Sequence, residues 1–290
     1  MEDVSSIEVL RYQGAAPGPK LVVFGAVHGN EPRGTEGIRR VCQELDAGTL
    51  KLLCGSVSFV PIANPPAYKE DRRYLEEDLN RVFRKTDAPT ASEAKLANEL
   101  SMLIDEADVF LDIHTTSAPG PSCVFIDFPT PANRELAGVV GAEYALLSWP
   151  ELYEHNEFFD SYDTTRYAFE AGKDGIIVET GQHEEEEAAN RARLVILRVM
   201  RHLGLLEGSA ESLLQYRPIR MTALFRKESI EDRFVENWEH LEPIPEGTVI
   251  AVRKDGTEIR TGKDLVMLLP KHQAIPGEEW FYLGEEVGTK

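Results

Sequence analysis

Short apolar runs rich in β-branched residues recur along the first 206 residues of the chain. Four of them have the length and composition of buried strands, at residues 21–27, 57–63, 109–114 and 176–180. Helical patterns of apolar and polar positions alternate with these runs, at residues 34–45, 91–107 and 184–206. The alternation predicts an α/β domain with a mostly parallel, mixed central sheet and helices on both faces.

The pattern changes after residue 206. Turn signals such as Lys254-Asp255-Gly256 separate short apolar segments, and three of these segments are typical of strands, at residues 249–253, 257–260 and 266–269. We therefore expect two domains: the α/β domain over residues 1–208 and a small β-rich C-terminal domain over residues 209–290.

The 290-residue chain has a formal net charge of −19. Such a surface repels nucleic acid and anionic membranes, so we expect neither as a partner. No apolar stretch approaches the roughly 20 residues of a membrane-spanning helix, and the acidic start of the chain has no signal-peptide pattern. The three cysteines form neither a metal-spaced pair nor a disulfide framework, which favours a cytoplasmic location.

Polar side chains stand at the ends of three of the predicted strands. His28 follows the first strand, His114 ends the third and Glu179 ends the fourth, while Glu31 lies in the loop of His28. Ligands of open α/β sheets bind outside the carboxyl ends of the strands, so these four side chains should face one crevice. Three of them, His28, Glu31 and His114, suit a catalytic zinc site, with Glu179 as the carboxylate that takes a proton from water. The alternative is an ordinary loop that turns at Gly29.

Two further clusters contain arginine, which binds carboxylates through paired hydrogen bonds. The first contains Arg73, Asn80 and Arg81, and its alternative is a surface loop in which arginines pair with neighbouring acidic residues. The second contains Tyr162 and Arg166, and its alternative is an ordinary helix start with a capping aspartate or threonine.

Together these stretches resemble the succinylglutamate desuccinylase and aspartoacylase family, which is related to zinc carboxypeptidases of the carboxypeptidase A type. The matching motifs occur in the family's order between residues 21 and 181; they are GAVHGNE, the segment from Arg73 to Phe83, LDIHTT, the segment from Tyr162 to Arg166, and VETG. The resemblance implies a zinc-carboxypeptidase-like α/β fold followed by a β domain.

The resemblance also assigns roles at the metal. His28, Glu31 and His114 would bind one zinc ion per chain. Glu179 would act as the general base and then as the acid. Arg73 would polarise the carbonyl group that is attacked.

Substrate contacts follow from the same resemblance. Asn80 and Arg81 would bind one substrate carboxylate, and Tyr162 and Arg166 would bind a second one on the amino-acid side chain. Tyr282 is the candidate for a tyrosine contributed by the C-terminal domain. The gap between Arg166 and Glu179 is longer than in aspartoacylases of the mammalian type.

The implied function is zinc-dependent hydrolysis of the amide bond of a small, anionic N-acyl amino acid. Tyr162 to Arg166 favour a substrate of the N-acetylaspartate type, whereas the NPPA segment at 64–67 favours the N2-succinylglutamate type. Two alternatives are a carboxypeptidase-type peptidase and a non-catalytic zinc-binding protein. A homodimer is left open.

Overall fold

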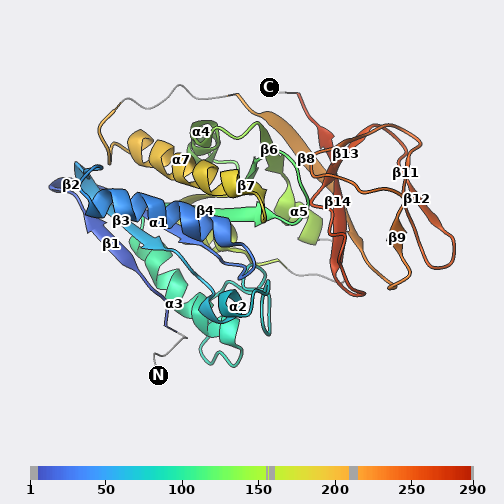
Figure 1. Ribbon diagram of the computed structural model, residues 1–290, viewed down its shortest axis with the longest axis horizontal. Coiled ribbons are helices and arrows are strands. Elements are labelled where there is room, and N and C mark those ends of the chain that lie inside the picture. Colours follow the sequence, from blue (N-terminus) through green and yellow to red (C-terminus); the bar gives the residue numbers. More distant parts are fainter. Residues whose placement is uncertain (1–5, 155, 157–160, 209–214, 289–290) are drawn as a thin grey trace.

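One large mixed sheet organises the molecule. The computed structural model describes residues 6–154, 156, 161–208 and 215–288 (Figure 1). Across the sheet the order of the strands in this part of the chain is β1 (Leu10–Gln13), β3 (Cys54–Val60), β2 (Ala16–Gly25), β4 (Val109–Thr116), β7 (Asp174–Gln182), β5 (Cys123–Ile126), β6 (Tyr144–Leu147), β8 (Arg217–Arg226), β14 (Glu279–Glu286), β13 (Leu265–Leu268) and β10 (Pro243–Ile244). Strands β3, β2, β4 and β7 are mutually parallel.

Helices cover both faces of the parallel part of this sheet, as the sequence predicts. They are α1 (Pro32–Asp46), α2 (Pro65–Lys69), α3 (Ser92–Glu106), α4 (Pro131–Val140), α5 (Trp149–Glu154), α6 (Thr164–Glu170) and α7 (Glu186–His202). None of the helices in the described residues is long and apolar enough to cross a membrane.

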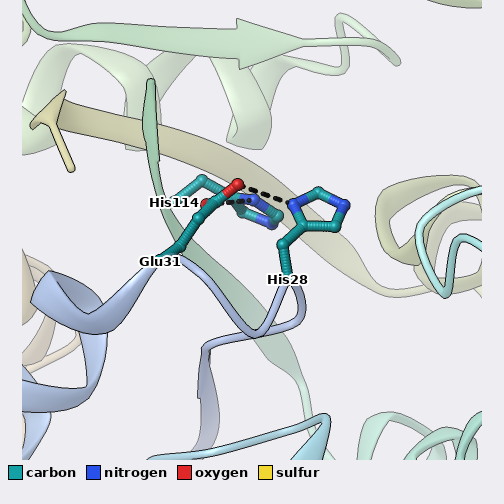
Figure 2. A group of neighbouring side chains, drawn as sticks. All are labelled: His28, Glu31 and His114. Atoms are coloured by element: carbon teal, nitrogen blue, oxygen red, sulfur yellow. Dashed lines mark hydrogen bonds and ion pairs between the residues drawn. The ribbon is translucent and has the colours of Figure 1, made fainter. Parts of the chain in front are cut away.

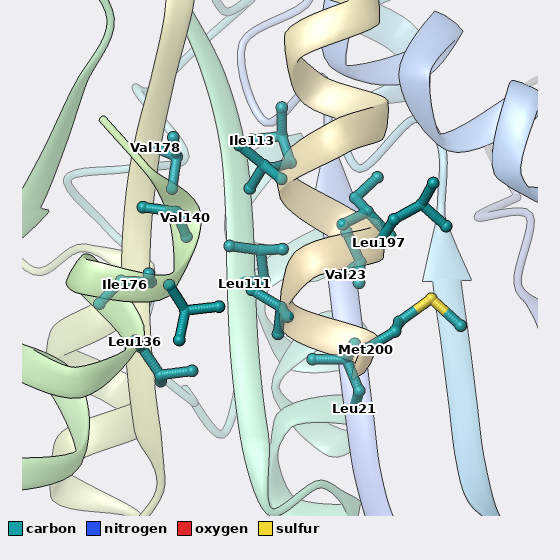
Figure 3. Close-up of a cluster of buried hydrophobic side chains, with 14 of the residues drawn as sticks. Leu21, Val23, Leu111, Ile113, Leu136, Val140, Ile176, Val178, Leu197 and Met200 are labelled. Atoms are coloured by element: carbon teal, nitrogen blue, oxygen red, sulfur yellow. The ribbon is translucent and has the colours of Figure 1, made fainter. Parts of the chain in front are cut away.

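Alternation along the strands divides the apolar side chains between two cores. On β2, Leu21 and Val23 join the core under α1, α4 and α7, whereas Val22 and Phe24 join the core under α3. Figure 3 shows the first core, in which Leu197 and Met200 of α7 lie over side chains of β2 and β4. Every second residue of a strand faces the same side, so these fully buried strands are apolar on both faces.

The sheet is widened by two short strands that the sequence pattern did not indicate. The helix that connects them was not indicated either. Strand β5 runs antiparallel to β7, and β6 runs parallel to β5. Helix α4 connects them, with the Thr130 hydroxyl accepting the Asn133 N–H at its start. This insertion places Phe125 beside Ile177, on the strand that carries Glu179.

The C-terminal region is rich in strands, as expected. Strand β8 pairs in parallel with β6, and β14, β13 and β10 follow it, so these strands continue the central sheet. A separate small sheet consists of β12 (Glu258–Arg260), β11 (Val249–Val252) and β9 (Arg233–Phe234). Figure 1 shows these strands together at one end of the molecule. The division at residues 208 and 209 stays a prediction, and residues 209–214 lie outside the described residues.

Candidate active site

A cavity of about 710 Å³ opens at the carboxyl ends of the central strands. His28 follows β2, His114 lies near the end of β4 and Glu179 near the end of β7. His114 and Glu179 are direct neighbours across the β4–β7 pair. These three side chains and Glu31 all line the cavity, so the structure brings the four residues together as the strand ends predict.

Glu31 lies between the two histidines. Its Oε1 is 2.8 Å from Nδ1 of His28 and its Oε2 is 3.1 Å from Nδ1 of His114, as Figure 2 shows. The candidate ligand atoms of these three residues lie within 4.8 Å of one another, and the three side chains are almost fully buried. Two imidazole nitrogens and one carboxylate that converge in this way suit a catalytic zinc ion.

The outer nitrogens of both rings also face carboxylates. Nε2 of His28 is 3.1 Å from Oδ1 of Asp78, and Nε2 of His114 is 3.1 Å from Oδ2 of Asp112. The contact of His28 with Asp78 is a hydrogen bond, which holds the ring proton on Nε2 and leaves Nδ1 free for a metal, as is usual for metal-binding histidines. Nε2 of His114 lies at ion-pair distance from Asp112 but has no hydrogen-bond partner among the described residues. Asp112 and His114 are two residues apart on β4, so they lie on the same face of the sheet.

Local backbone geometry places the His28 loop. The Glu31 N–H donates to the carbonyl of His28, and Pro32 then begins α1, where a proline needs no hydrogen-bond acceptor. The backbone of Gly29 is so close to α2 that a Cβ atom at this position would lie 2.1 Å from the carbonyl carbon of Ala67. The loop is therefore held between the sheet and α2.

Glu179 is buried, and its Oε2 has no hydrogen-bond partner among the described residues. Burial, followed by the negative charge of Glu31, raises the pKa of Glu179 to about 8. Burial also opposes ionisation of Glu31, but the electrostatic interactions and hydrogen bonds with His28 and His114 outweigh it and hold the pKa of Glu31 well below its usual value. One carboxylate is thus kept as an ionised ligand, and the other is poised to exchange a proton.

Arg73 and Asn80 line the cavity beside this group. Arg73 Nε donates to Asp78 Oδ2 at 2.9 Å, and its Nη1 is 3.6 Å from Glu31 Oε1. The side-chain oxygen of Asn80 accepts the backbone N–H of Thr164 at 3.1 Å. Arg73 is thus held in the cavity by carboxylates of the chain, and the roles that the sequence assigns to Arg73 and Asn80 stay predictions.

Arg81 also lines the cavity, but its guanidinium group is already paired. Its Nη2 lies 2.9 and 3.0 Å from the two carboxylate oxygens of Glu279, and its Cζ atom lies 5.0 Å from the centroid of the Trp149 ring. Glu279 also accepts from Lys271 Nζ at 3.0 Å. Burial opposes the charge of Glu279, but Arg81 and then Lys271 outweigh it and hold its pKa far below its usual value.

Tyr282 reaches the same cluster from β14. Its hydroxyl is 2.7 Å from that of Tyr153, which in turn donates to Glu279 at 2.6 Å. Tyr282 lines the cavity, and its role as the tyrosine contributed by the C-terminal region stays a prediction. Its burial raises its pKa well above the usual value, so this hydroxyl remains protonated and can donate a hydrogen bond.

Tyr162 and Arg166 are not among the described residues that line the cavity. The Tyr162 hydroxyl donates to Glu170, Arg166 Nε donates to Glu170 at 3.2 Å, and the Arg166 guanidinium group stacks on the Tyr162 ring. Asp163 caps α6 by accepting the Arg166 backbone N–H, so the segment begins a helix as its alternative reading holds. A role for Tyr162 and Arg166 in substrate binding stays a prediction.

Comparison with known proteins decides the family. The sequence profile of the succinylglutamate desuccinylase/aspartoacylase catalytic domain matches residues 17–203, which include the three candidate metal ligands and Glu179. The chain belongs to this family.

Several relatives in the desuccinylase/aspartoacylase family can be named. A probable aspartoacylase of Acaryochloris marina is 27% identical over 164 residues, 53% of this chain and 55% of that protein. A succinylglutamate desuccinylase of Pseudomonas aeruginosa is 29% identical over 138 residues, 45% and 41% of the two chains. An N-acyl-aromatic-L-amino acid amidohydrolase (carboxylate-forming) of Rattus norvegicus is 31% identical over 177 residues, 56% and 53%. The chain thus spans about half the length of the curated relatives it matches.

Solved structures show the same fold over nearly the whole chain. A succinylglutamate desuccinylase/aspartoacylase from Rhodobacter sphaeroides has a TM-score of 0.76 at 20% identity and covers 98% of this chain and 90% of its own. A succinylglutamate desuccinylase from Vibrio cholerae has a TM-score of 0.77 at 16% identity, covering 97% and 86%. The expected α/β architecture with a β-rich C-terminal region is therefore confirmed.

Several cavity residues of this family member were missed from sequence. They include Asp127, Trp149, Lys271 and Glu279. Glu279 is one of two consecutive glutamates in an acid-rich chain, and nothing local distinguishes it from its neighbour. His183 also lines the cavity, and its Nδ1 lies 2.8 Å from the Thr115 hydroxyl.

Proposed function

We propose that this protein is a zinc-dependent deacylase, which hydrolyses the amide bond of a small N-acyl amino acid. One observation supports the proposal above all: the buried group of His28, Glu31 and His114 shares a cavity with Glu179, whose Oε2 has no partner among the described residues. The names of relatives in the family, aspartoacylase, succinylglutamate desuccinylase and amidohydrolase, agree with this chemistry.

His28 Nδ1, His114 Nδ1 and the Glu31 carboxylate are the groups that would hold the metal. When bound, zinc supplies Lewis acidity and lowers the pKa of water toward about 7. Glu179 takes a proton from the attacking water as the new C–O bond forms at the acyl carbon. Arg73 donates hydrogen bonds to the oxygen of that carbon as negative charge develops there. Glu179 then passes the proton to the nitrogen as the C–N bond breaks, leaving a carboxylate and a free amino acid.

The substrate class expected from the sequence is an acidic N-acyl amino acid, of the N-acetylaspartate or N2-succinylglutamate type. Arg81 and Lys271 are cations that line the cavity and suit one substrate carboxylate. Lys271, Glu279 and Tyr282 come from the C-terminal region, and their presence in the cavity favours a small substrate over a peptide chain. Peptide hydrolysis and zinc binding without catalysis remain the alternatives to be tested.

The assay measures amino acid released by the zinc-loaded protein from N-acetylaspartate, N2-succinylglutamate, a neutral N-acetyl amino acid and an unblocked dipeptide. We expect one N-acyl substrate to be hydrolysed, and the Glu179→Gln variant to lose about 10²- to 10⁴-fold in kcat, as when a general base is removed. Zinc content of the variant, measured in parallel, controls for loss of the metal.

Three results would contradict the proposal. Hydrolysis of the dipeptide alone would favour the peptidase. One equivalent of bound zinc without hydrolysis of any compound would favour the non-catalytic protein. Unchanged turnover by Glu179→Gln would remove Glu179 from the mechanism. A cytoplasmic location is proposed on the sequence alone. The sequence leaves a homodimer open, and light scattering of the purified protein tests the oligomeric state.

A further inference from the structure

The cavity contains a carboxyl group, that of Asp127, for which the proposed reaction has no use. Asp127 directly follows β5, lines the cavity and is 6% exposed. Its Oδ1 has no hydrogen-bond partner in the described part of the chain. A buried acceptor without a partner is unfavourable, so this oxygen is suited to a donor group on a bound molecule.

Hydrogen bonds around Asp127 indicate where its proton lies. Thr165 Oγ1 is 2.6 Å from Asp127 Oδ2 and 2.8 Å from Asp163 Oδ1, although a hydroxyl has only one proton to donate. Asp163 Oδ1 also accepts the backbone N–H of Arg166 at 2.7 Å, so Asp163 is the ionised member that accepts from Thr165. Asp127 Oδ2 then carries a proton and donates to Thr165, and Oδ1 remains an acceptor.

Electrostatics agree with this assignment. Burial, and after it the negative charge of Asp163, raises the pKa of Asp127 well above its usual value. A positively charged ligand would reverse both effects, because it replaces the lost hydration and offsets the charge of the pair. The Asp127 carboxyl thus provides a site for a hydrogen-bond donor of a ligand. The ligand should bind there more tightly if the donor group carries a positive charge.

Between Glu179 and Asp127 the cavity wall is apolar. Phe125 and Ile177 are neighbours across the β5–β7 pair. Ile177 and Glu179 are two residues apart on β7, so both side chains face the same side of the sheet. Both side chains line the cavity together with Trp149. A straight chain of methylene groups would contact these three side chains on its way from the scissile amide to Asp127.

Cations of the cavity are already paired with acidic side chains of the protein. In the described residues, the lysines and arginines that line it are Arg73, Arg81 and Lys271. Arg73 is paired with Asp78, and both Arg81 and Lys271 are paired with Glu279. Each carboxylate of a diacid substrate would have to compete with these acidic side chains for a cation of the cavity. A substrate side chain that ends in an amine would not.

We propose that Asp127 determines specificity in a side-chain subsite, which takes amino acids whose straight alkyl side chain ends in a hydrogen-bond donor. The donor is a protonated amine in preference to a hydroxyl, because Asp163 and the acidic cavity favour a cation. This inference rests on the proposed deacylase and narrows its substrate class, replacing the acidic side chain expected from sequence.

A matched substrate series tests the subsite. The compounds are the Nα-acetyl derivatives of L-lysine, L-norleucine, L-6-hydroxynorleucine and L-2-aminoadipate, which differ only at the end of the side chain. We expect kcat/KM for the lysine derivative to exceed that for the norleucine derivative by about 10- to 100-fold, the effect of a hydrogen bond to a charged group. The hydroxyl derivative should lie between them and the aminoadipate derivative should be poorest.

Asp127→Asn provides the matched variant. Its amide can donate to Thr165 and present an oxygen to the cavity, so it keeps the shape and the acceptor but cannot become charged. We expect the ratio of kcat/KM for lysine over norleucine to fall at least about tenfold, while the ratio for hydroxynorleucine over norleucine stays within about threefold. Asp127→Leu should abolish both preferences. If a variant does not fold, the wild-type series still decides.

The inference and the proposed function fail in different ways. Equal kcat/KM for the lysine and norleucine derivatives, or a preference for aminoadipate, would overturn the subsite and leave the deacylase intact. If the zinc-loaded protein hydrolyses N-acetylaspartate or N2-succinylglutamate but none of the four derivatives, the subsite is overturned and the deacylase stands. If it hydrolyses none of these compounds, the proposed function fails. The subsite is then tested by calorimetric titration with free L-lysine and L-norleucine, and equal affinities would overturn it.

Discussion

Each imidazole of the candidate metal group has two nitrogens with different surroundings. The Nδ1 atoms of His28 and His114 face Glu31, and their Nε2 atoms face Asp78 and Asp112. Burial lowers the pKa of His114, but the charges of Asp112 and Glu31 outweigh it and raise that pKa well above its usual value. The surroundings therefore stabilise positive charge at this position, whether on the ring or on a bound metal.

The carboxylate behind His114 should matter for metal affinity although it touches no ligand atom. Asp112 is fully buried, and Thr164 also donates to it at 2.7 Å. In Asp112→Asn the hydrogen-bonding shape persists but the charge is lost, so we expect zinc affinity to fall about 10- to 100-fold. Competition with a chromogenic chelator measures this.

Asp87→Asn is the control, because Asp87 is exposed and outside the cavity lining. It removes the same charge from the chain without touching the histidine. Equal zinc affinity in both variants and in the wild type would show that Asp112 serves folding alone.

Individual elements bring the metal group together by ending or beginning at the same place. Strand β2 ends at Gly25, and α1 begins at Pro32, one residue after Glu31. The intervening loop passes so close to α2 that position 29 has no room for a side chain, and the residue there is Gly29. Such a close approach is a reason for glycine that depends on packing between elements, not on backbone dihedral angles.

Gly29→Ala should therefore displace the His28 loop. Its Cβ would lie 2.1 Å from a backbone carbon of α2, so either the loop or the helix must move. We expect the free energy of unfolding to fall by about 1–3 kcal/mol, as for other overpacked sites, and zinc affinity to fall with it. Urea denaturation and chelator competition measure the two quantities.

Gly262→Ala serves as its control, because no atom lies within 4 Å of a Cβ at that position. We expect its stability to change by less than about 0.5 kcal/mol, the range of ordinary surface substitutions. An effect of Gly29→Ala no larger than this would mean that the loop adapts to the added methyl group.

At this scale the apolar pattern predicted the strands and helices that build the centre of the sheet. It did not indicate β5, β6 or α4. Strands β5 and β6 have only four residues each, and such short apolar segments carry no periodicity that separates strand from helix. Their place in the sheet depends on pairing with β7 and β8, which no local pattern reports.

The whole molecule is joined across its two regions by the sheet and by buried polar contacts. His240 is one of these contacts, and it is 1% exposed. Its Nδ1 accepts the backbone N–H of Leu269 at 3.0 Å, and its Nε2 lies 3.4 Å from the Cys123 thiol on β5. Burial lowers the pKa of His240 to about 3, so the ring is neutral in the folded protein.

This histidine should make stability depend on pH. In the unfolded chain its pKa is about 6.5, so below that value the unfolded state binds a proton that the folded state does not. Its contribution is lost as the pH falls from about 6.5 toward 3, amounting to about 2 kcal/mol between pH 7 and pH 5. Urea unfolding at both pH values measures this.

His240→Asn isolates the effect, because its side-chain oxygen can accept the Leu269 N–H but does not titrate. The variant should be less stable than the wild type at pH 7, since a smaller side chain leaves a cavity. The difference between the two proteins should shrink by about 2 kcal/mol at pH 5. A difference that is the same at both pH values would rule out His240 as the titrating group.

The sequence by itself determined the centre of the site. His28, His114 and Glu179 stand at ends of strands whose apolar residues identify them, and parallel strands bring their carboxyl ends to one edge. Glu31 follows because it lies three residues from His28. The pairing of Arg81 with Glu279, 198 residues later in the chain, was decided only by the tertiary structure. The tertiary structure also decided that Arg166 packs against Glu170 and that Oδ1 of Asp127 has no partner among the residues described. A local pattern reports burial and periodicity, whereas the partner of a buried charge depends on which distant strands meet.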